Sequence, residues 1–209
     1  MPLDATSHIV ALAMSVLIGG AAGLRIEGAA NIRAVRAQTD RPIIGLLKVR
    51  RPGSDIYITP TIADVEIVLS AGADIVAFDG TDRPRAESVE ALCAFVRRVG
   101  RTSMADVSTA AEGRHALDAG ADIVSTTMGG YTPYSRLIKG PDFALMSELA
   151  ALGVPFAAEG RIRTPNDVRR SFELGAAYIV VGSAITRPDV ITRRFVAAAP
   201  SPLTRSIEP

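Results

Sequence analysis

The sequence predicts an α/β fold in which parallel strands and helices alternate around a barrel. An apolar strand repeatedly follows a glycine that ends a helix, at Gly20, Gly72, Gly120 and Gly175, at intervals of 52, 48 and 55 residues. A second apolar segment lies within each interval, so each interval holds two strand–helix units. Strands that alternate with helices at this spacing are typical of a parallel sheet with covered faces.

Apolar runs locate the strands, and periodicity and capping locate the helices. The clearest helix start is Thr164, a natural N-cap followed by Pro165 and, at capping-box spacing, by Asp167. We expect seven strands, near 23–26, 42–48, 75–79, 102–107, 123–128, 155–159 and 178–182. We expect eight helices, near 7–19, 28–38, 61–71, 86–99, 109–119, 141–152, 165–174 and 188–197.

The excess of helices over strands indicates that one strand of an eight-stranded barrel is missing. We therefore predict a TIM (β/α)8 barrel whose first strand belongs upstream of Met1, with an open α/β sheet as the alternative. We expect one barrel domain over residues 1–199 and a disordered, proline-rich tail over residues 200–209.

Composition excludes several classes of protein. The formal net charge of +1 gives no indication of a nucleic-acid partner. A single cysteine, Cys93, excludes an intramolecular disulfide and suits a reducing cytoplasm. The uncharged run from Ile9 to Leu24 is short for a membrane span and has no basic residue before it. We expect this run to form a buried helix, and we expect no membrane association.

Residues at the carboxyl ends of the strands line the active site of such a barrel. Lys48 is one of only two lysines and follows an apolar strand, so we expect a partly desolvated ammonium with a lowered pKa. Glu159 ends another strand and is expected to hold a proton near neutral pH. The two form an acid–base pair suited to moving a proton at carbon. A structural ion pair of Lys48 with Asp79 or Asp106 is the alternative.

The last two strands are each followed by glycine and a helix start. Gly160, Gly182 and Ser183 can present backbone N–H groups there, and Arg187 adds a cation, which together indicate a phosphate site. The carboxylates are scattered and no histidine joins them, so we expect no metal site. Residues 129–140 form a long loop that we interpret as a lid.

Motifs between about Gly19 and Phe195 resemble, in order, those of the N-acetylmannosamine-6-phosphate 2-epimerase family. They include Gly23-Leu-Arg-Ile-Glu, Ile44-Gly-Leu-Leu-Lys, Met104-Ala-Asp-Val-Ser-Thr, Ser125-Thr-Thr-Met-Gly-Gly, Ala158-Glu-Gly-Arg-Ile and Val181-Gly-Ser-Ala-Ile-Thr-Arg-Pro. The resemblance implies a cytoplasmic, cofactor-free isomerase of amino-sugar and sialic acid catabolism. It would interconvert N-acetylmannosamine 6-phosphate and N-acetylglucosamine 6-phosphate, with a phosphosugar as its partner. The sequence leaves the oligomeric state open, and a homodimer is one option.

The resemblance also implies roles for single residues. Lys48 would remove and return the C2 proton, and Glu159 would act as acid at a sugar oxygen. The substrate would be bound by Arg25, Asp106 and Thr127, and its phosphate by Gly160, Gly182, Ser183 and Arg187. The family's first strand, with a glutamine that touches substrate, has no counterpart here. A non-catalytic sugar-phosphate-binding remnant and an aldolase in which Lys48 forms a Schiff base are the alternatives.

Overall fold

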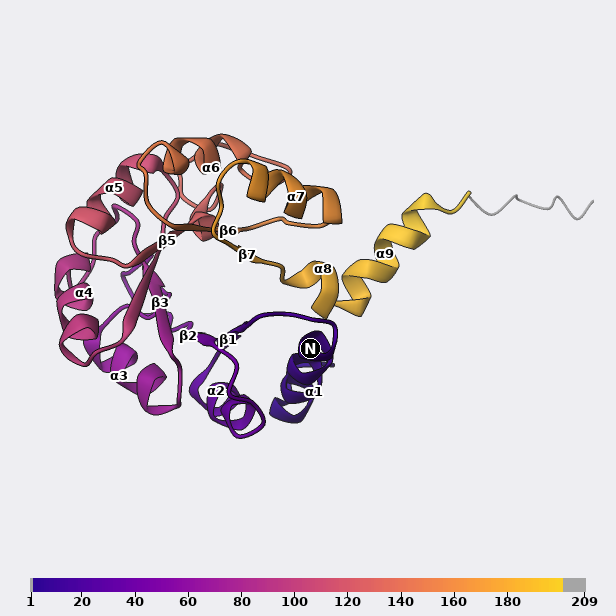
Figure 1. Cartoon of the computed structure of the whole chain (residues 1–209), viewed down its shortest axis with the longest axis horizontal. Coiled ribbons are helices and arrows are strands. Elements are labelled where there is room, and N and C mark those ends of the chain that lie inside the picture. The colour runs from indigo at the N-terminus through magenta and orange to yellow at the C-terminus, as the bar shows by residue number, and fades with distance from the viewer. Residues whose placement is uncertain (1, 201–209) are drawn as a thin grey trace, which may run out of the picture.

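The computed structural model describes residues 2–200, in which seven parallel strands form one sheet that curves into a ring. The strands follow one another around the ring in chain order (Figure 1). They are β1 (Leu24–Glu27), β2 (Ile43–Leu46), β3 (Ile75–Asp79), β4 (Thr102–Asp106), β5 (Ile123–Ser125), β6 (Phe156–Glu159) and β7 (Tyr178–Val180). The predicted barrel is confirmed, because the helices lie outside the ring rather than on both faces of an open sheet.

Helices connect the strands as the spacing predicts. They are α1 (Thr6–Ile18), α2 (Ala29–Arg36), α3 (Ile62–Ser70), α4 (Val89–Arg98), α5 (Ala110–Asp118), α6 (Phe143–Ala150), α7 (Pro165–Glu173), α8 (Ser183–Thr186) and α9 (Pro188–Ala198). A short 3₁₀ helix, η1 (Thr126–Met128), follows β5. The capping box predicted at Thr164 is confirmed: its hydroxyl accepts from the N–H of Asp167, and that carboxylate accepts from the N–H of Thr164.

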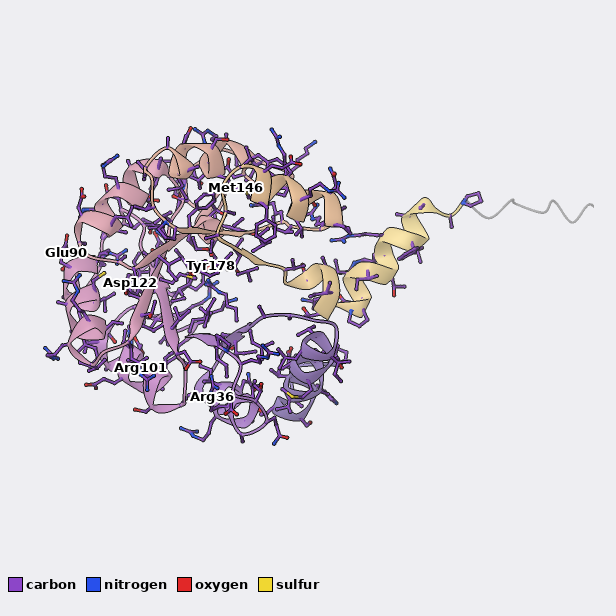
Figure 2. The ribbon with its side chains drawn as sticks, viewed as in Figure 1. Arg36, Glu90, Arg101, Asp122, Met146 and Tyr178 are labelled. Carbon is purple, nitrogen blue, oxygen red and sulfur yellow. The ribbon has the colours of Figure 1, made fainter. Side chains whose placement is uncertain are left out.

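The two faces of the sheet pack differently. One face, with side chains such as Ile43, Val76 and Phe156, packs against the helices in the larger apolar cluster. The other face contributes a smaller cluster inside the ring, which includes Leu46 and Met104. In Figure 2 the side chains from the strands crowd the space that the ring encloses. The interior is therefore a packed core, and polar chemistry is confined to the strand ends.

The ring is open on one side. Within residues 2–200 no strand joins β7 to β1, which is the gap expected of a barrel that lacks one strand. Tyr178 of β7 is 50% exposed beside this gap. Helix α1, which we expected to be buried, buries only Ala13, because it lies at the open side and packs against α2. Helix α9 points away from the ring and buries no residue (Figure 1).

No helix in the described part of the chain is long and apolar enough to cross a bilayer. Most of the predicted tail, residues 201–209, lies outside the described residues.

Candidate active site

Four of the predicted site residues are in direct contact. Arg25 is the second residue of β1, Asp106 ends β4, Thr127 lies in η1 directly after β5, and Glu159 ends β6. These segments converge because parallel strands place all their carboxyl ends at one mouth of the barrel. The register supports this placement, since Asp106 pairs with Ser125 of β5 and with Asp79 of β3.

Arg25 joins two carboxylates. Its Nη1 and Nη2 donate to Oδ1 and Oδ2 of Asp106 at 3.1 and 2.6 Å, in the forked geometry of a bidentate pair. Nη1 also lies 2.9 Å from Oε2 of Glu159. The hydroxyl of Thr127 lies 2.9 Å from Oδ1 of Asp106 and 3.1 Å from Oε2 of Glu159, and so bridges them. We call these four residues the mouth cluster.

The mouth cluster holds two carboxylates against one guanidinium. The side chains of Arg25 and Asp106 are 8% and 0% exposed, and that of Glu159 is 21% exposed. Burial raises the pKa of Glu159 and the charge of Asp106 adds to the rise, while Arg25, Thr127 and Lys48 oppose it. Burial opposes the charge of Arg25, but the two carboxylates hold its pKa above the ordinary value. The direction of this shift in the pKa of Glu159 is the one expected from the sequence.

Lys48 lies beside this cluster but is not part of it. It follows β2 by two residues and forms an isolated antiparallel bridge with Ile58, and its N–H lies 3.2 Å from Oε1 of Glu27. The residue is exposed, so the expected desolvation of its ammonium is wrong for this structure. The reason is that β2 ends at Leu46 and the chain then leaves the buried sheet.

The alternative, a structural ion pair of Lys48 with Asp79 or Asp106, is also wrong, because arginines form the ion pairs with both of these carboxylates. Asp106 pairs with Arg25, and the buried Asp79 pairs with Arg83 at 2.5 Å and with Arg85 at 3.4 Å. Burial raises the pKa of Asp79, while the bonds from Thr81 and the two arginines oppose the rise. Sequence reasoning missed these two arginines. Their spacing of four and six residues after Asp79, in a turn that contains Gly80 and Pro84, was the signal available.

The predicted phosphate residues are only partly assembled. Gly160 follows Glu159 directly with a φ of 101°, Gly182 is the N-cap of the four-residue α8, and Ser183 is its first residue. Because Val180 is the register partner of Glu159, the chain after β7 starts beside the mouth cluster. Arg187, however, pairs with Asp189 through bonds of 2.8 and 2.9 Å on the exposed segment that leads into α9. In the described residues no group of histidine, cysteine and carboxylate side chains fits a metal ion.

The loop over residues 129–140 is held in place rather than detached from the barrel. The hydroxyl of Tyr134 donates to Oε1 of Glu112 at 2.6 Å, and the hydroxyls of Ser108 and Thr132 lie 2.9 Å apart. Arg161 donates to the loop carbonyls as well. The loop therefore forms a fixed wall beside β5, which does not support our interpretation of it as a lid.

A ring of parallel strands surrounded by helices, with buried charged side chains at its carboxyl mouth, defines the class of TIM barrels. Comparison with known proteins identifies the family. Residues 9–201 match the family described as N-acetylmannosamine-6-phosphate epimerase (NanE). The chain belongs to this family, and it is an enzyme of the isomerase class.

Individual relatives agree with this assignment. A Clostridioides difficile protein named N-acetylmannosamine-6-phosphate 2-epimerase is 42% identical over 200 residues, which cover 94% of this chain and 90% of the relative. A bifunctional NanE/NanK enzyme of Brucella melitensis is 46% identical, and the match covers 96% of this chain but 39% of that enzyme.

Solved structures also resemble the chain. The N-acetylmannosamine-6-phosphate 2-epimerase from Clostridium perfringens superposes with a TM-score of 0.92 at 40% identity, covering 95% of this chain and 88% of that one. A Burkholderia cenocepacia structure described as a phosphonomutase, at a TM-score of 0.61 and 18% identity, shares the fold alone.

Proposed function

We propose that this chain interconverts N-acetylmannosamine 6-phosphate and N-acetylglucosamine 6-phosphate by exchanging the proton at C2, in amino-sugar and sialic acid catabolism. The observation that carries the proposal is the mouth cluster, in which Glu159 with a raised pKa is held by Arg25 and Thr127 beside Lys48. The two sugars differ only in the configuration at C2. The reaction therefore needs a base at that carbon and a group that stabilises the charge that develops next to it.

Lys48 acts as the base. The C2 proton is acidic only while C1 is an aldehyde, because the electrons of the broken C–H bond then form a C1=C2 double bond and place charge on the C1 oxygen. Lys48 takes the proton at one face of C2, and a proton returned at the other face gives the epimer. Lys48 is exposed in this structure, so the bound substrate must cover it and exclude water from the reacting atoms.

Glu159 acts as the acid. Its raised pKa keeps a larger fraction of the carboxyl protonated near neutral pH, so it can donate to a sugar oxygen during ring opening and stabilise the C1 oxygen. Arg25 places a fixed positive charge 2.9 Å from the same carboxyl, where it offsets charge that appears in the transition state. Asp106 and Thr127 orient Arg25 and Glu159 and bind substrate hydroxyl or amide groups.

The phosphate binds at the neighbouring strand ends. In this proposal the anion is bound by backbone N–H groups of Gly160, which follows β6, and of Gly182 and Ser183, which follow β7. Arg187 completes this site by exchanging Asp189 for the phosphate. Phosphate binding at a distance from C2 fixes that carbon against Lys48, so the energy of phosphate binding is used for orientation.

The test is proton NMR of the purified protein with N-acetylmannosamine 6-phosphate in heavy water. We expect the gluco epimer to appear with deuterium at C2. Lys48→Arg should abolish the exchange, while Lys139→Arg, at the only other lysine, serves as the matched control and should exchange at the wild-type rate. A folded protein that exchanges no C2 proton would contradict the proposal. Trapping of substrate on Lys48 by borohydride would instead favour the aldolase.

We also propose that the enzyme is a cytoplasmic homodimer, with residues 1–199 as one domain. Helix α9 buries none of its residues, and Phe195 and Val196 are 75% and 66% exposed on it. Apolar side chains of this size on an isolated helix indicate a contact with another chain. Light scattering should give twice the chain mass of 21.9 kDa, and Phe195→Glu should lower it. A monomeric wild-type protein would refute the assembly.

A further inference from the structure

Arg161 has a backbone conformation that arginine rarely adopts. Its φ is 59°, in the left-handed region where a β-carbon crowds the backbone, and it follows directly after Glu159 and Gly160. Thr59 is the other non-glycine residue with a positive φ in the described chain. A glycine would adopt this φ without strain, so the arginine side chain must provide interactions that hold the backbone in place.

The side chain of Arg161 clamps the loop that follows β5. Its Nη1 donates to the carbonyl of Gly129 at 2.8 Å, and Nη2 lies 3.4 Å from the carbonyl of Gly130. The guanidinium also stacks on the ring of Tyr131, 4.4 Å from its centroid. The fit is close, because a β-carbon added to Gly130 would lie 3.0 Å from Nη2 of Arg161.

The 3₁₀ helix η1, which directly precedes this loop, holds Glu159 from the other side. The hydroxyl of Thr126 donates to the carbonyl of Glu159 at 2.7 Å and lies 2.9 Å from its N–H. The hydroxyl of Thr127 lies 3.1 Å from Oε2 of Glu159. The tip of β6 is therefore bonded twice to the segment that follows β5: the two threonines of η1 bond to Glu159, and Arg161, two residues later, bonds to the loop.

We propose that Arg161 is a positioning residue for Glu159, which acts by locking residues 129–131 onto the turn that follows β6. The inference rests on the proposed function, since it concerns the acid of that reaction. Arg161 bonds to carbonyls of the loop, so its effect reaches the reaction through the backbone of Glu159 and through the two threonines. Loosening the clamp would let Glu159 move away from Arg25 and admit water to the mouth cluster.

The test compares Arg161→Gly with Arg163→Ala. Glycine accepts the positive φ, so the variant loses the clamp without a new backbone strain, and Arg163 is a nearby exposed arginine for the control. We expect kcat of Arg161→Gly to fall about tenfold or more with KM within about threefold, because a displaced acid weakens the transition state more than binding. Added guanidinium at low concentration should restore part of kcat. Arg163→Ala should match the wild type.

A second measurement does not depend on turnover. The carboxyl of Glu159, observed by carbon-13 NMR, should titrate at a lower pH in Arg161→Gly, since burial is the chief cause of its raised pKa. Unchanged kcat and an unchanged Glu159 titration would overturn the inference, whatever the change in stability. If the wild type is inactive, the proposed function is contradicted. The comparison of the Glu159 titration between the wild type and Arg161→Gly then still decides whether Arg161 positions Glu159. If Arg161→Gly does not fold, Tyr131→Leu, which removes the stacked ring, should show the same two changes.

Discussion

Replacing Asp106 with asparagine separates the electrostatic role of the mouth cluster from its shape. The asparagine side chain has almost the same volume but no charge, and it keeps one of the two oxygen acceptors. In the wild type, Asp106 is fully buried and accepts two bonds from Arg25, at 3.1 and 2.6 Å, and one from Thr127 at 2.9 Å. The NH2 group of the new asparagine replaces one carboxylate oxygen and cannot accept a hydrogen bond. At least one of the bonds that Arg25 donates to Asp106 is therefore lost.

The magnitude follows from the remaining partners of Arg25. Removing one member of a buried ion pair costs about 3–5 kcal/mol when the other charge is left alone. Arg25 is not left alone, since Oε2 of Glu159 remains 2.9 Å from its Nη1. We therefore expect a loss of about 2–3 kcal/mol in the free energy of unfolding, near the value of one charged hydrogen bond. Urea unfolding at neutral pH with an unchanged m-value measures it.

The same substitution should shift the titration of Glu159. Burial is the main cause of its raised pKa and the negative charge of Asp106 adds to it, so Asp106→Asn should lower this pKa. The limb of the pH–rate profile that belongs to Glu159 should move to lower pH. A variant as stable as the wild type, or a limb that stays in place or moves to higher pH, would refute the view that Asp106 and Glu159 share one guanidinium.

Three further predictions test other parts of the chain. Lys48→Arg should lower kcat/KM by about 10²–10⁴-fold with little change in melting temperature, because arginine keeps the charge but cannot act as a base; near-normal turnover would remove Lys48 from the mechanism. Because the pKa of Glu159 is raised by folding, its contribution to stability is full below the pKa of an unfolded glutamate and is lost as pH rises through the folded value. Glu159→Gln should therefore gain stability relative to the wild type between acidic and neutral pH, by about 1.4 kcal/mol per unit of raised pKa, as urea unfolding at several pH values would show. Gly45→Ala should cost about 1–3 kcal/mol in thermal unfolding, since the new β-carbon would lie 2.6 Å from that of Ala73, whereas Gly140→Ala has no atom within 4 Å and should change little.

The fold and the chemical types in the site could be predicted because they are encoded locally. Glycine before an apolar run marks the end of a helix and the start of a strand, and Thr164 with Asp167 marks a helix start, wherever these segments lie in space. The ends of the strands then follow from the strands themselves. For this reason the strand pattern alone placed Glu159 at the mouth of the barrel, and the family motifs added Arg25 and Asp106.

The pairing within the site depended on the tertiary structure. Arg25 and Asp106 are 81 residues apart in the sequence. Nothing in the sequence indicated that Arg25, rather than Lys48, would form the ion pair with Asp106. Arg83 and Arg85 likewise enclose Asp79 only after the turn has folded back. The exposure of Lys48 depended on where β2 ends, and strand boundaries respond to packing that a local pattern does not contain.

The sequence by itself thus determined the alternation of elements, the helix caps and the family, because each depends on neighbours within a few residues or on motifs read in order. Only the tertiary structure decided which charges meet, that Arg161 holds the loop beside Glu159, and that α9 leaves the ring. The physical reason is that each charged side chain in the sequence has several possible partners for an ion pair or a hydrogen bond. The choice among these partners is made by distance, burial and the surrounding charges, which exist only once the chain has folded.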